Sequence, residues 1–158
     1  MSDREKWLDM IYEGPVSGLA ELLATSGTLL INDPFGTEFV SKAVWRIDKA
    51  ILENLGARPD PDVEVVNELV GRARKPMDLL IEAGVPVDGP VANDLPPLHV
   101  AAQLPTDVIL RELVGLGANV NRMVTAMGGP ADFAFHRIPR EYLEGAGALR
   151  LKSPGDLS

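Results

Sequence analysis

Cysteine is absent from the 158 residues of this chain, which excludes disulfide bonds and thiolate chemistry. There are only two histidines, His99 and His136, and no HExxH arrangement, so no tight zinc site is expected. Aromatic residues make up only 5% of the chain, whereas hydrophobic residues of all kinds make up 46%. This balance predicts helices packed through aliphatic side chains.

Long apolar runs and an excess of basic charge are also lacking. No uncharged apolar stretch reaches the roughly 18 residues of a membrane span, and residues 1–6 do not lead into the apolar core of a secretory signal, so a cytoplasmic protein is expected. The 15 basic residues face 23 acidic ones, a formal net charge of −8. We therefore expect neither nucleic acid nor an anionic membrane as the main ligand, and the acidic balance favours a basic protein partner.

Patterns that carry catalysis or hold a cofactor are missing as well. There is no GxSxG elbow and no phosphate-binding glycine loop. Asp60, Asp62 and Glu64 lack the glycine and the final glutamate of a calcium loop, and a solvated connector explains them better. We expect no enzyme activity, no metal and no cofactor.

A small basic cluster stands out against the acidic background. It comprises Arg72, Arg74 and Lys75, and it is too small to grip a nucleic-acid duplex. The cluster is expected to be a charged turn, and the alternative is that it contacts an acidic patch on a partner.

The most informative stretch runs from residue 95 to residue 121. A proline at the start of a helix needs no N–H donor there, so Pro97 opens a predicted helix over 97–103. Residues 105–107 break this helix, and Thr106 or Asp107 caps a second predicted helix over 108–116. Gly117 supplies the left-handed residue that ends it. The unit is helix, turn, helix and extended loop, and it cannot bury its apolar face alone.

This unit resembles an ankyrin repeat. Pro97-Leu98-His99-Val100-Ala101 is similar to the T-P-L-H-x-A signature of that family, with Pro96 in place of the threonine. The resemblance implies that His99 ties neighbouring loops together. With Pro97 and Leu98, and with Gly84 and Gly117, it forms the set of expected structural residues.

Features of the same unit recur at a spacing of 33 residues. Gly84 precedes Gly117 by 33 positions, and the segment 129–134 follows 96–101 at the same distance. Earlier copies are fainter, since Gly56 lies only 28 positions before Gly84. The chain is thus predicted to be an all-α, ankyrin-type helix-turn-helix solenoid, with a non-repeating helical bundle as the rival. Five units are expected, at about 3–33, 34–61, 62–92, 93–125 and 126–151, followed by a tail at 152–158.

The resemblance implies a concave groove lined by first helices and by loop tips. Aromatic residues and arginine on such a surface are typical of binding hot spots. An alternative for Trp45 is that it fills a gap left by the shortened third unit. The predicted partner-binding residues on the helices are Tyr12, Trp45, Asn67, Gln103, His136 and Arg137, and those on the loops are Asp33, Phe35, Asn93, Asp94, Met123 and Thr125.

A stack of this kind has no effector domain of its own, so it is expected to act by occupying a partner. The resemblance therefore implies a protein–protein interaction module, most sharply an inhibitor or immunity-type protein. Its partner would be a basic toxin or a nucleic-acid-processing enzyme, towards which negative charge speeds docking. The alternatives are a scaffold or adaptor subunit and a small enzyme with an unrecognised site. A monomer is favoured.

Overall fold

The computed structural model describes residues 2–124 and 127–149. This part of the chain is helical, as predicted, and its extended segments form only one isolated bridge, between Val124 and Gly128. The helices in chain order are α1 (Asp3–Glu13), α2 (Val16–Ile31), α3 (Thr37–Leu55), α4 (Val63–Ala73), α5 (Lys75–Ala83), α6 (Pro97–Ala102), α7 (Val108–Gly115), the short 3-10 helix η2 (Pro130–Phe133) and α8 (Arg137–Gly145).

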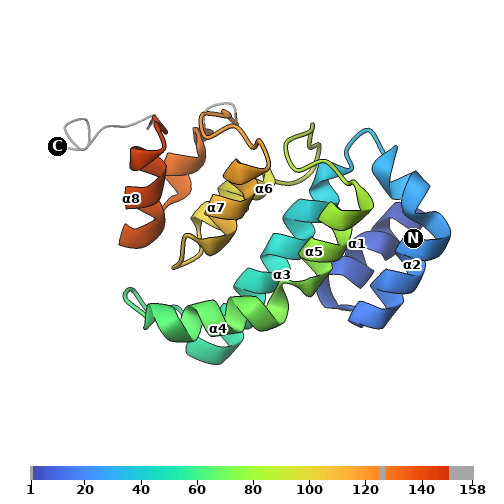
Figure 1. The fold of residues 1–158 in the computed structure, drawn as a ribbon, viewed down its shortest axis with the longest axis horizontal. Coiled ribbons are helices and arrows are strands. Elements are labelled where there is room, and N and C mark those ends of the chain that lie inside the picture. Colours follow the sequence, from blue (N-terminus) through green and yellow to red (C-terminus); the bar gives the residue numbers. More distant parts are fainter. Residues whose placement is uncertain (1, 125–126, 150–158) are drawn as a thin grey trace.

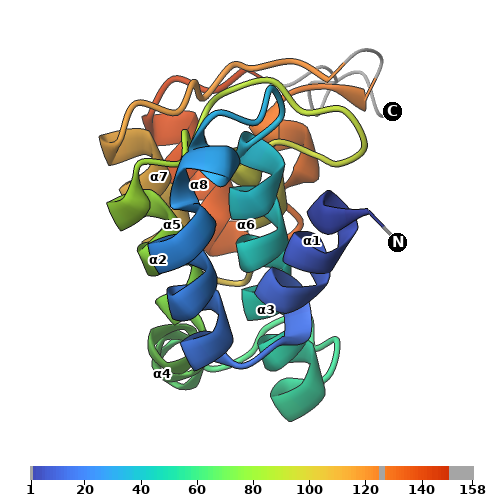
Figure 2. The same ribbon diagram turned by 90° about the vertical axis from the view of Figure 1, so that its right-hand side faces the viewer.

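The helices lie side by side in two rows. In one row α1 packs on α3, α3 on α6 and α6 on η2, while α2 packs on α5 in the other. α7 lies against α6, and α8 against η2. Figure 1 shows the pairs succeeding one another from α1 and α2 on the right to α8 on the left, and Figure 2 shows the loops gathered beyond the upper ends of the helices.

Three helix ends repeat the same geometry. Gly84, Gly117 and Gly147 follow α5, α7 and α8 with φ of 100°, 103° and 90°, a region that side chains disfavour. After each glycine the next amide donates to the carbonyl five residues back, from Val85 to Leu80 at 3.1 Å, from Ala118 to Leu113 at 3.0 Å and from Ala148 to Leu143 at 2.9 Å. Gly84 and Gly117 therefore take equivalent places in successive helix ends, 33 positions apart.

The stretch 34–61 differs from the helix-turn-helix pattern expected of it. α3 is one unbroken helix of 19 residues, because no proline or glycine interrupts Thr37–Leu55 and its apolar residues recur at helical spacing. α4 then crosses the lower edge of the molecule in Figure 1 before α5 rejoins the stack. The predicted helices 97–103 and 108–116 each end one residue earlier, at Ala102 and Gly115.

α3 lies at the centre of the molecule and contacts α1, α4, α5 and α6. Its apolar face is buried, and the apolar side chains of the neighbouring helices pack against it to form one continuous hydrophobic core. The buried apolar residues of α3 are Phe39, Val40, Ala43, Val44, Ile47 and Ile51.

A second face of α3 carries polar side chains that hold the loop 86–95. The Thr37 hydroxyl donates to the Pro86 carbonyl at 2.8 Å and accepts from the Gly89 amide at 2.8 Å. The Ser41 hydroxyl donates to the Leu95 carbonyl at 2.6 Å. Backbone groups of this loop, which has no sheet ladder, thus find hydrogen-bond partners on α3.

Glu38 is the charged member of this polar face. Its side chain is 2% exposed, it pairs with Arg4 of α1 at 2.9 Å, and it accepts hydrogen bonds from the amides of Ala92 and Asn93, the latter at 2.6 Å. Burial alone would raise the pKa of Glu38, but the two amides and the Arg4 guanidinium outweigh it and hold the pKa below its ordinary value. Glu38 therefore joins α1, α3 and the loop 86–95.

Successive loops are also bonded to one another. The Asp88 carboxylate accepts from the Asn119 amide at 3.3 Å, and the Asn121 side chain accepts from the Leu149 amide at 2.7 Å. Asp88 and Asn121 each lie four positions after the glycine that ends a helix, and each acceptor binds the amide two positions after the next such glycine. Arg122 adds a further tie by donating to the Gly89 carbonyl at 2.7 Å.

His99 is completely buried and connects its helix to the following loop. Its Nε2 lies 3.2 Å from the Gly128 carbonyl, which only accepts, so Nε2 carries the proton. Its Nδ1 has no hydrogen-bond partner among the described residues, and the ring packs edge-on against Phe133. Burial lowers the pKa of His99 despite the opposing Gly128 hydrogen bond.

Removing the carboxylate of Glu38 is expected to destabilise the whole fold. In Glu38→Ala two loop amides lose their acceptor and the guanidinium of Arg4 loses one of its two carboxylate partners, so the free energy of unfolding should fall by about 3 kcal/mol. Glu53→Ala is the matched control on the same helix, because its side chain is 65% exposed and its loss should cost less than about 0.5 kcal/mol. Urea unfolding of both variants measures this. Equal stabilities would contradict the role given to Glu38.

Acidification is expected to weaken the fold through His99. Because its pKa is lowered in the folded state, the unfolded chain takes up the proton first, and stability falls as the pH drops below about 6.5. One such group changes the free energy of unfolding by at most about 1.4 kcal/mol per pH unit. His99→Gln keeps a donor for the Gly128 carbonyl and removes the titration, so urea unfolding between neutral and mildly acidic pH should depend less on pH in the variant. Parallel curves would show that His99 does not titrate in this range.

Candidate functional site

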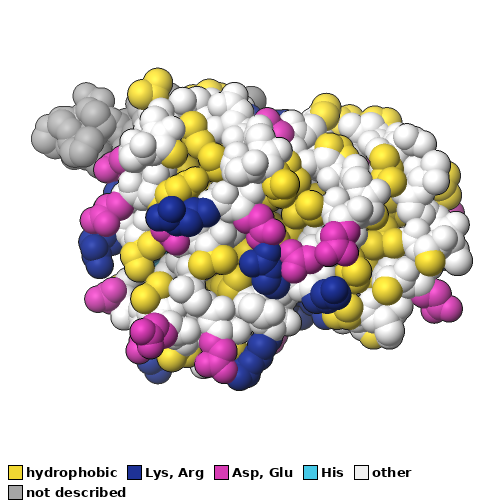
Figure 3. Space-filling model, in the orientation of Figure 1, with side chains coloured by type: hydrophobic (Ala, Val, Ile, Leu, Met, Phe, Trp, Pro, Cys, Tyr) yellow, Lys and Arg dark blue, Asp and Glu magenta, His cyan; other side chains and the backbone are white. Residues whose placement is uncertain are grey.

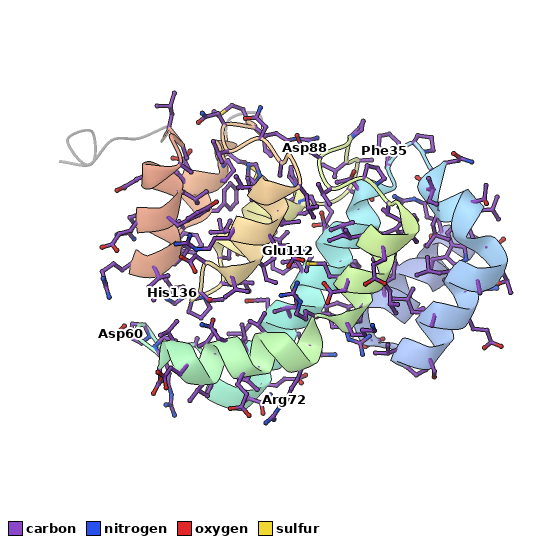
Figure 4. The ribbon with its side chains drawn as sticks, viewed as in Figure 1. Phe35, Asp60, Arg72, Asp88, Glu112 and His136 are labelled. Carbon is purple, nitrogen blue, oxygen red and sulfur yellow. The ribbon has the colours of Figure 1, made fainter. Side chains whose placement is uncertain are left out.

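Two surfaces present unusual side chains. The first, here called the loop edge, consists of residues 31–36, 86–95, 119–124, 127–129 and 149. The second, here called the Gln103 cleft, consists of two adjoining hollows of about 260 and 300 Å³ that share Pro59, Pro61, Pro105, Phe135 and His136. The two surfaces lie at opposite ends of the helices, with Phe35 and Asp88 at the upper edge of Figure 4 and Asp60 and His136 at its lower left.

The loop edge exposes large apolar side chains on rigid loops. Phe35 is 39% exposed, Met123 52% and Met127 56%, and Ile31 and Leu149 are exposed beside them. Helices far apart in the sequence supply these loops, and the hydrogen bonds of Asp88 and Asn121 fix the spacing between the last three. A row of apolar side chains on preorganised loops is suited to contact with another protein.

The polar residues predicted on the loops have partners inside the molecule. Asp33 pairs with Arg4 at 3.2 Å and accepts from the Phe35 amide at 2.8 Å. Asp94 accepts from the indole N–H of Trp45 at 2.9 Å, and the Asn93 amide donates to Glu38. Thr125 lies outside the described residues. Of the predicted loop residues in the described part, Phe35 and Met123 are the ones whose apolar side chains face solvent.

The predicted row of inner-helix residues is divided among separate places. Gln103 and His136 line the Gln103 cleft together, and Arg137 lines its outer hollow. Trp45 is partly buried against the core and bonded to Asp94. Asn67 accepts from the Thr106 hydroxyl at 2.5 Å and so joins α4 to the α6–α7 turn.

Tyr12 lies in a third hollow, of about 380 Å³, on the α1 side of α3. The ammonium groups of Lys42 and Lys49 lie 5.3 and 4.9 Å from the centre of its ring. Glu13 and Glu53 each approach Lys49, at 3.8 and 3.9 Å, so charges of both signs line this hollow. Such paired surface charges contribute little to stability.

Both arginines of the basic cluster at the α4–α5 turn are paired with carboxylates. Arg72 pairs with Glu68 one turn earlier on α4, and Arg74 pairs with Asp78 at 3.0 Å and with Glu112 of α7. Arg72 projects from the lower edge of the molecule, whereas Glu112 lies near its centre (Figure 4). Arg74 thereby connects the α4–α5 turn to α7.

The chemically distinctive residue of the Gln103 cleft is Asp48, which the sequence analysis did not single out. It comes from α3 and lines the larger hollow with Gln103 and His136. Burial raises the pKa of the Asp48 carboxyl, although the nearby His136 acts in the opposite direction. A signal was available, because Asp48 lies four positions after buried Val44 and three before buried Ile51, next to the apolar face of α3.

The lining of the Gln103 cleft, among the described residues, includes none of the common side-chain nucleophiles. No serine, threonine or cysteine is among the residues that line either hollow, so no side-chain hydroxyl or thiol nucleophile accompanies Asp48 and His136. Among residues 2–124 and 127–149, no group of three or more His, Cys, Asp or Glu side chains is placed to hold a metal ion. No helix in this part of the chain has the length and apolar character needed to cross a membrane.

Comparison with family models, with curated proteins and with solved structures finds no match for this chain.

Replacing the Asp48 carboxylate by an amide is expected to stabilise the protein. Burial disfavours the charged form of Asp48, so its stability cost is present above the raised pKa and is relieved as the pH falls through it. Asp48→Asn should therefore raise the melting temperature by up to about 3 °C at neutral pH, with a smaller gain in acid. Differential scanning calorimetry at two pH values checks this. A lower melting temperature at neutral pH would mean that Asp48 has a stabilising partner.

Proposed function

We propose that this chain is an ankyrin-type helical stack that acts as a non-catalytic protein–protein interaction module. In its sharpest form it is an inhibitor or immunity-type protein that binds and blocks a toxin or another enzyme. The observation that carries the proposal is the loop edge, where exposed apolar side chains stand on loops held in a fixed register by the repeated hydrogen bonds of Asp88 and Asn121.

The stacked arrangement is supported by features that recur along the chain. The left-handed glycines 84, 117 and 147, the carbonyl bonds that follow them and the loop-to-loop bonds repeat from one helix pair to the next. On this proposal the units are α1 with α2, α3 with α5, α6 with α7, and η2 with α8. α4 is then an insertion within the second unit. This one unit, α3 with α5, takes the place of the two units expected over 34–61 and 62–92.

The loop edge suits a protein partner because of its composition. Figure 3 shows that acidic and basic side chains lie mostly over the middle and lower parts of this face, while the upper edge is largely apolar and uncharged. Interfaces between proteins have a centre depleted in charge and a charged surround. The net charge of −8 would raise the rate of encounter with a basic partner, and the apolar loop tips would hold it.

Replacing the apolar loop tips is expected to remove partner binding without unfolding the protein. Phe35→Ser with Met123→Ser changes two exposed residues, so stability should stay within about 1 kcal/mol while affinity for the partner falls at least about a hundredfold. Leu29→Ser is the matched control, because Leu29 is 60% exposed on α2 and lies outside the loop edge. A partner captured from the native host supplies the binding measurement.

The activity of that partner separates the possible roles. Loss of its enzymatic activity in a one-to-one complex supports the inhibitor, whereas unchanged activity indicates an adaptor. If the loop-tip variant binds as well as the wild type and the Leu29→Ser control does not, the interface lies on the α2 surface around Leu29 and the proposal is wrong.

A further inference from the structure

The larger hollow of the Gln103 cleft has apolar walls that stay open to solvent. Phe135 is 67% exposed and Leu52 47%, and Pro59 and Pro61 line the hollow with them. Large apolar side chains exposed together in a hollow are typical of ligand sites. Its volume of about 300 Å³ is at the small end of the range for such sites, so it suits a ligand about as large as one amino acid. The label of His136 marks its position in Figure 4.

Charged groups of both signs line this hollow without pairing with each other. Asp48 comes from α3 and Arg58 from the segment between α3 and α4. Neither side chain makes a hydrogen bond or an ion pair with another residue in the described part of the chain. By contrast, Arg4, Arg74 and Arg122 each pair with a carboxylate. The hollow therefore holds one unpaired charge of each sign.

The other charges of the cleft line its smaller hollow. Arg137 pairs with Glu141 at 3.5 Å, Arg140 donates to the Ala134 carbonyl at 3.4 Å, and Asp60 lines the same hollow. Positive and negative charges in and around the cleft are thus nearly balanced, and its net charge selects neither a cation nor an anion. What the larger hollow offers a ligand is a separate acceptor and donor of opposite charge.

Asp48 is the charged group that gains most from a ligand. It is half-buried between Ile51 and Leu52 of the same lining, and burial raises the pKa of its carboxyl, although the nearby His136 acts in the opposite direction. A carboxylate in this position has lost water without gaining an ion pair. The side-chain oxygen of Gln103 adds a second acceptor in the same hollow. An ammonium group would find both acceptors there.

We propose that this hollow binds a free apolar amino acid, such as L-phenylalanine, as its zwitterion. The α-ammonium group donates to the Asp48 carboxylate and the Gln103 oxygen, and the α-carboxylate accepts from the Arg58 guanidinium. The apolar side chain lies against Phe135 and Leu52. A zwitterion satisfies both unpaired charges at once, which a purely cationic or purely anionic ligand does not. This site goes beyond the proposed interaction function and uses none of the loop edge.

Three related ligands test the proposal on the full wild-type chain. We would titrate the 15N-labelled protein with L-phenylalanine, with L-phenylalanine amide, which lacks the carboxylate, and with N-acetyl-L-phenylalanine, which lacks the ammonium group. The amide signals of Leu52, Gly56 and Gln103 report on the hollow. Phenylalanine is expected to shift these signals saturably, and each derivative is expected to bind at least about tenfold more weakly because it lacks one charge.

Matched variants assign each charge of the ligand to its partner. In Asp48→Asn, phenylalanine should bind no better than the N-acetyl derivative, and in Arg58→Gln it should bind no better than the amide. Glu53→Gln is the control, because Glu53 is on α3 but outside the larger hollow, and it should leave all three affinities unchanged.

Several results would overturn the proposal. They are equal binding of phenylalanine and either derivative to the wild type, saturable shifts confined to other parts of the molecule, and no saturable binding up to the solubility limit. If Asp48→Asn failed to fold, the three ligands on the wild type and on Arg58→Gln would still decide, since Arg58 is exposed. Failure of this site would leave the loop edge standing, and failure of the loop-tip test would leave this site standing.

Discussion

The contact between α3 and the loop 86–95 is the constraint on which the rest of the structure depends. This loop has no ladder of its own, so the amides and carbonyls that pack against α3 need hydrogen-bond partners there. Thr37, Glu38 and Ser41 supply partners along one side of a single helix, and Glu38 brings Arg4 of α1 into the same network. Because one partner is charged and buried, the network stabilises only when it is complete.

The position of this loop sets the positions of the loops beyond it. Asp88 and Gly89 bind Asn119 and Arg122, and Asn121 in turn binds Leu149, so each loop is placed by the one before it. The relative positions of the apolar loop tips therefore depend on the contacts of α3 with the loop 86–95, and not only on interactions within each loop. This dependence makes α3 the element through which a distant mutation would reach the loop edge.

Several elements could be read from the sequence because their signals are local. The proline at 97, the breaker at 105–107 and the glycines 84 and 117 act within one turn of chain, and the helices they predicted are present to within one residue. The helix-turn-helix unit predicted over 34–61 differs from the single helix Thr37–Leu55, because a faint repeat was preferred to the unbroken 3.6-residue pattern of α3. The cleft could not be predicted, since Asp48, Gln103 and His136 meet only through the packing of α6 on α3 and of η2 on α6.

Amide hydrogen exchange of the loop 86–95 tests the central claim most directly. If α3 holds this loop as described, the amides of Gly89, Ala92 and Asn93 should exchange at least about a thousandfold more slowly than in an unstructured peptide, and together with the amides of α3, because both would then open in the same cooperative event. Exchange of these three amides at the rates of an unstructured peptide, while α3 stays protected, would contradict the account.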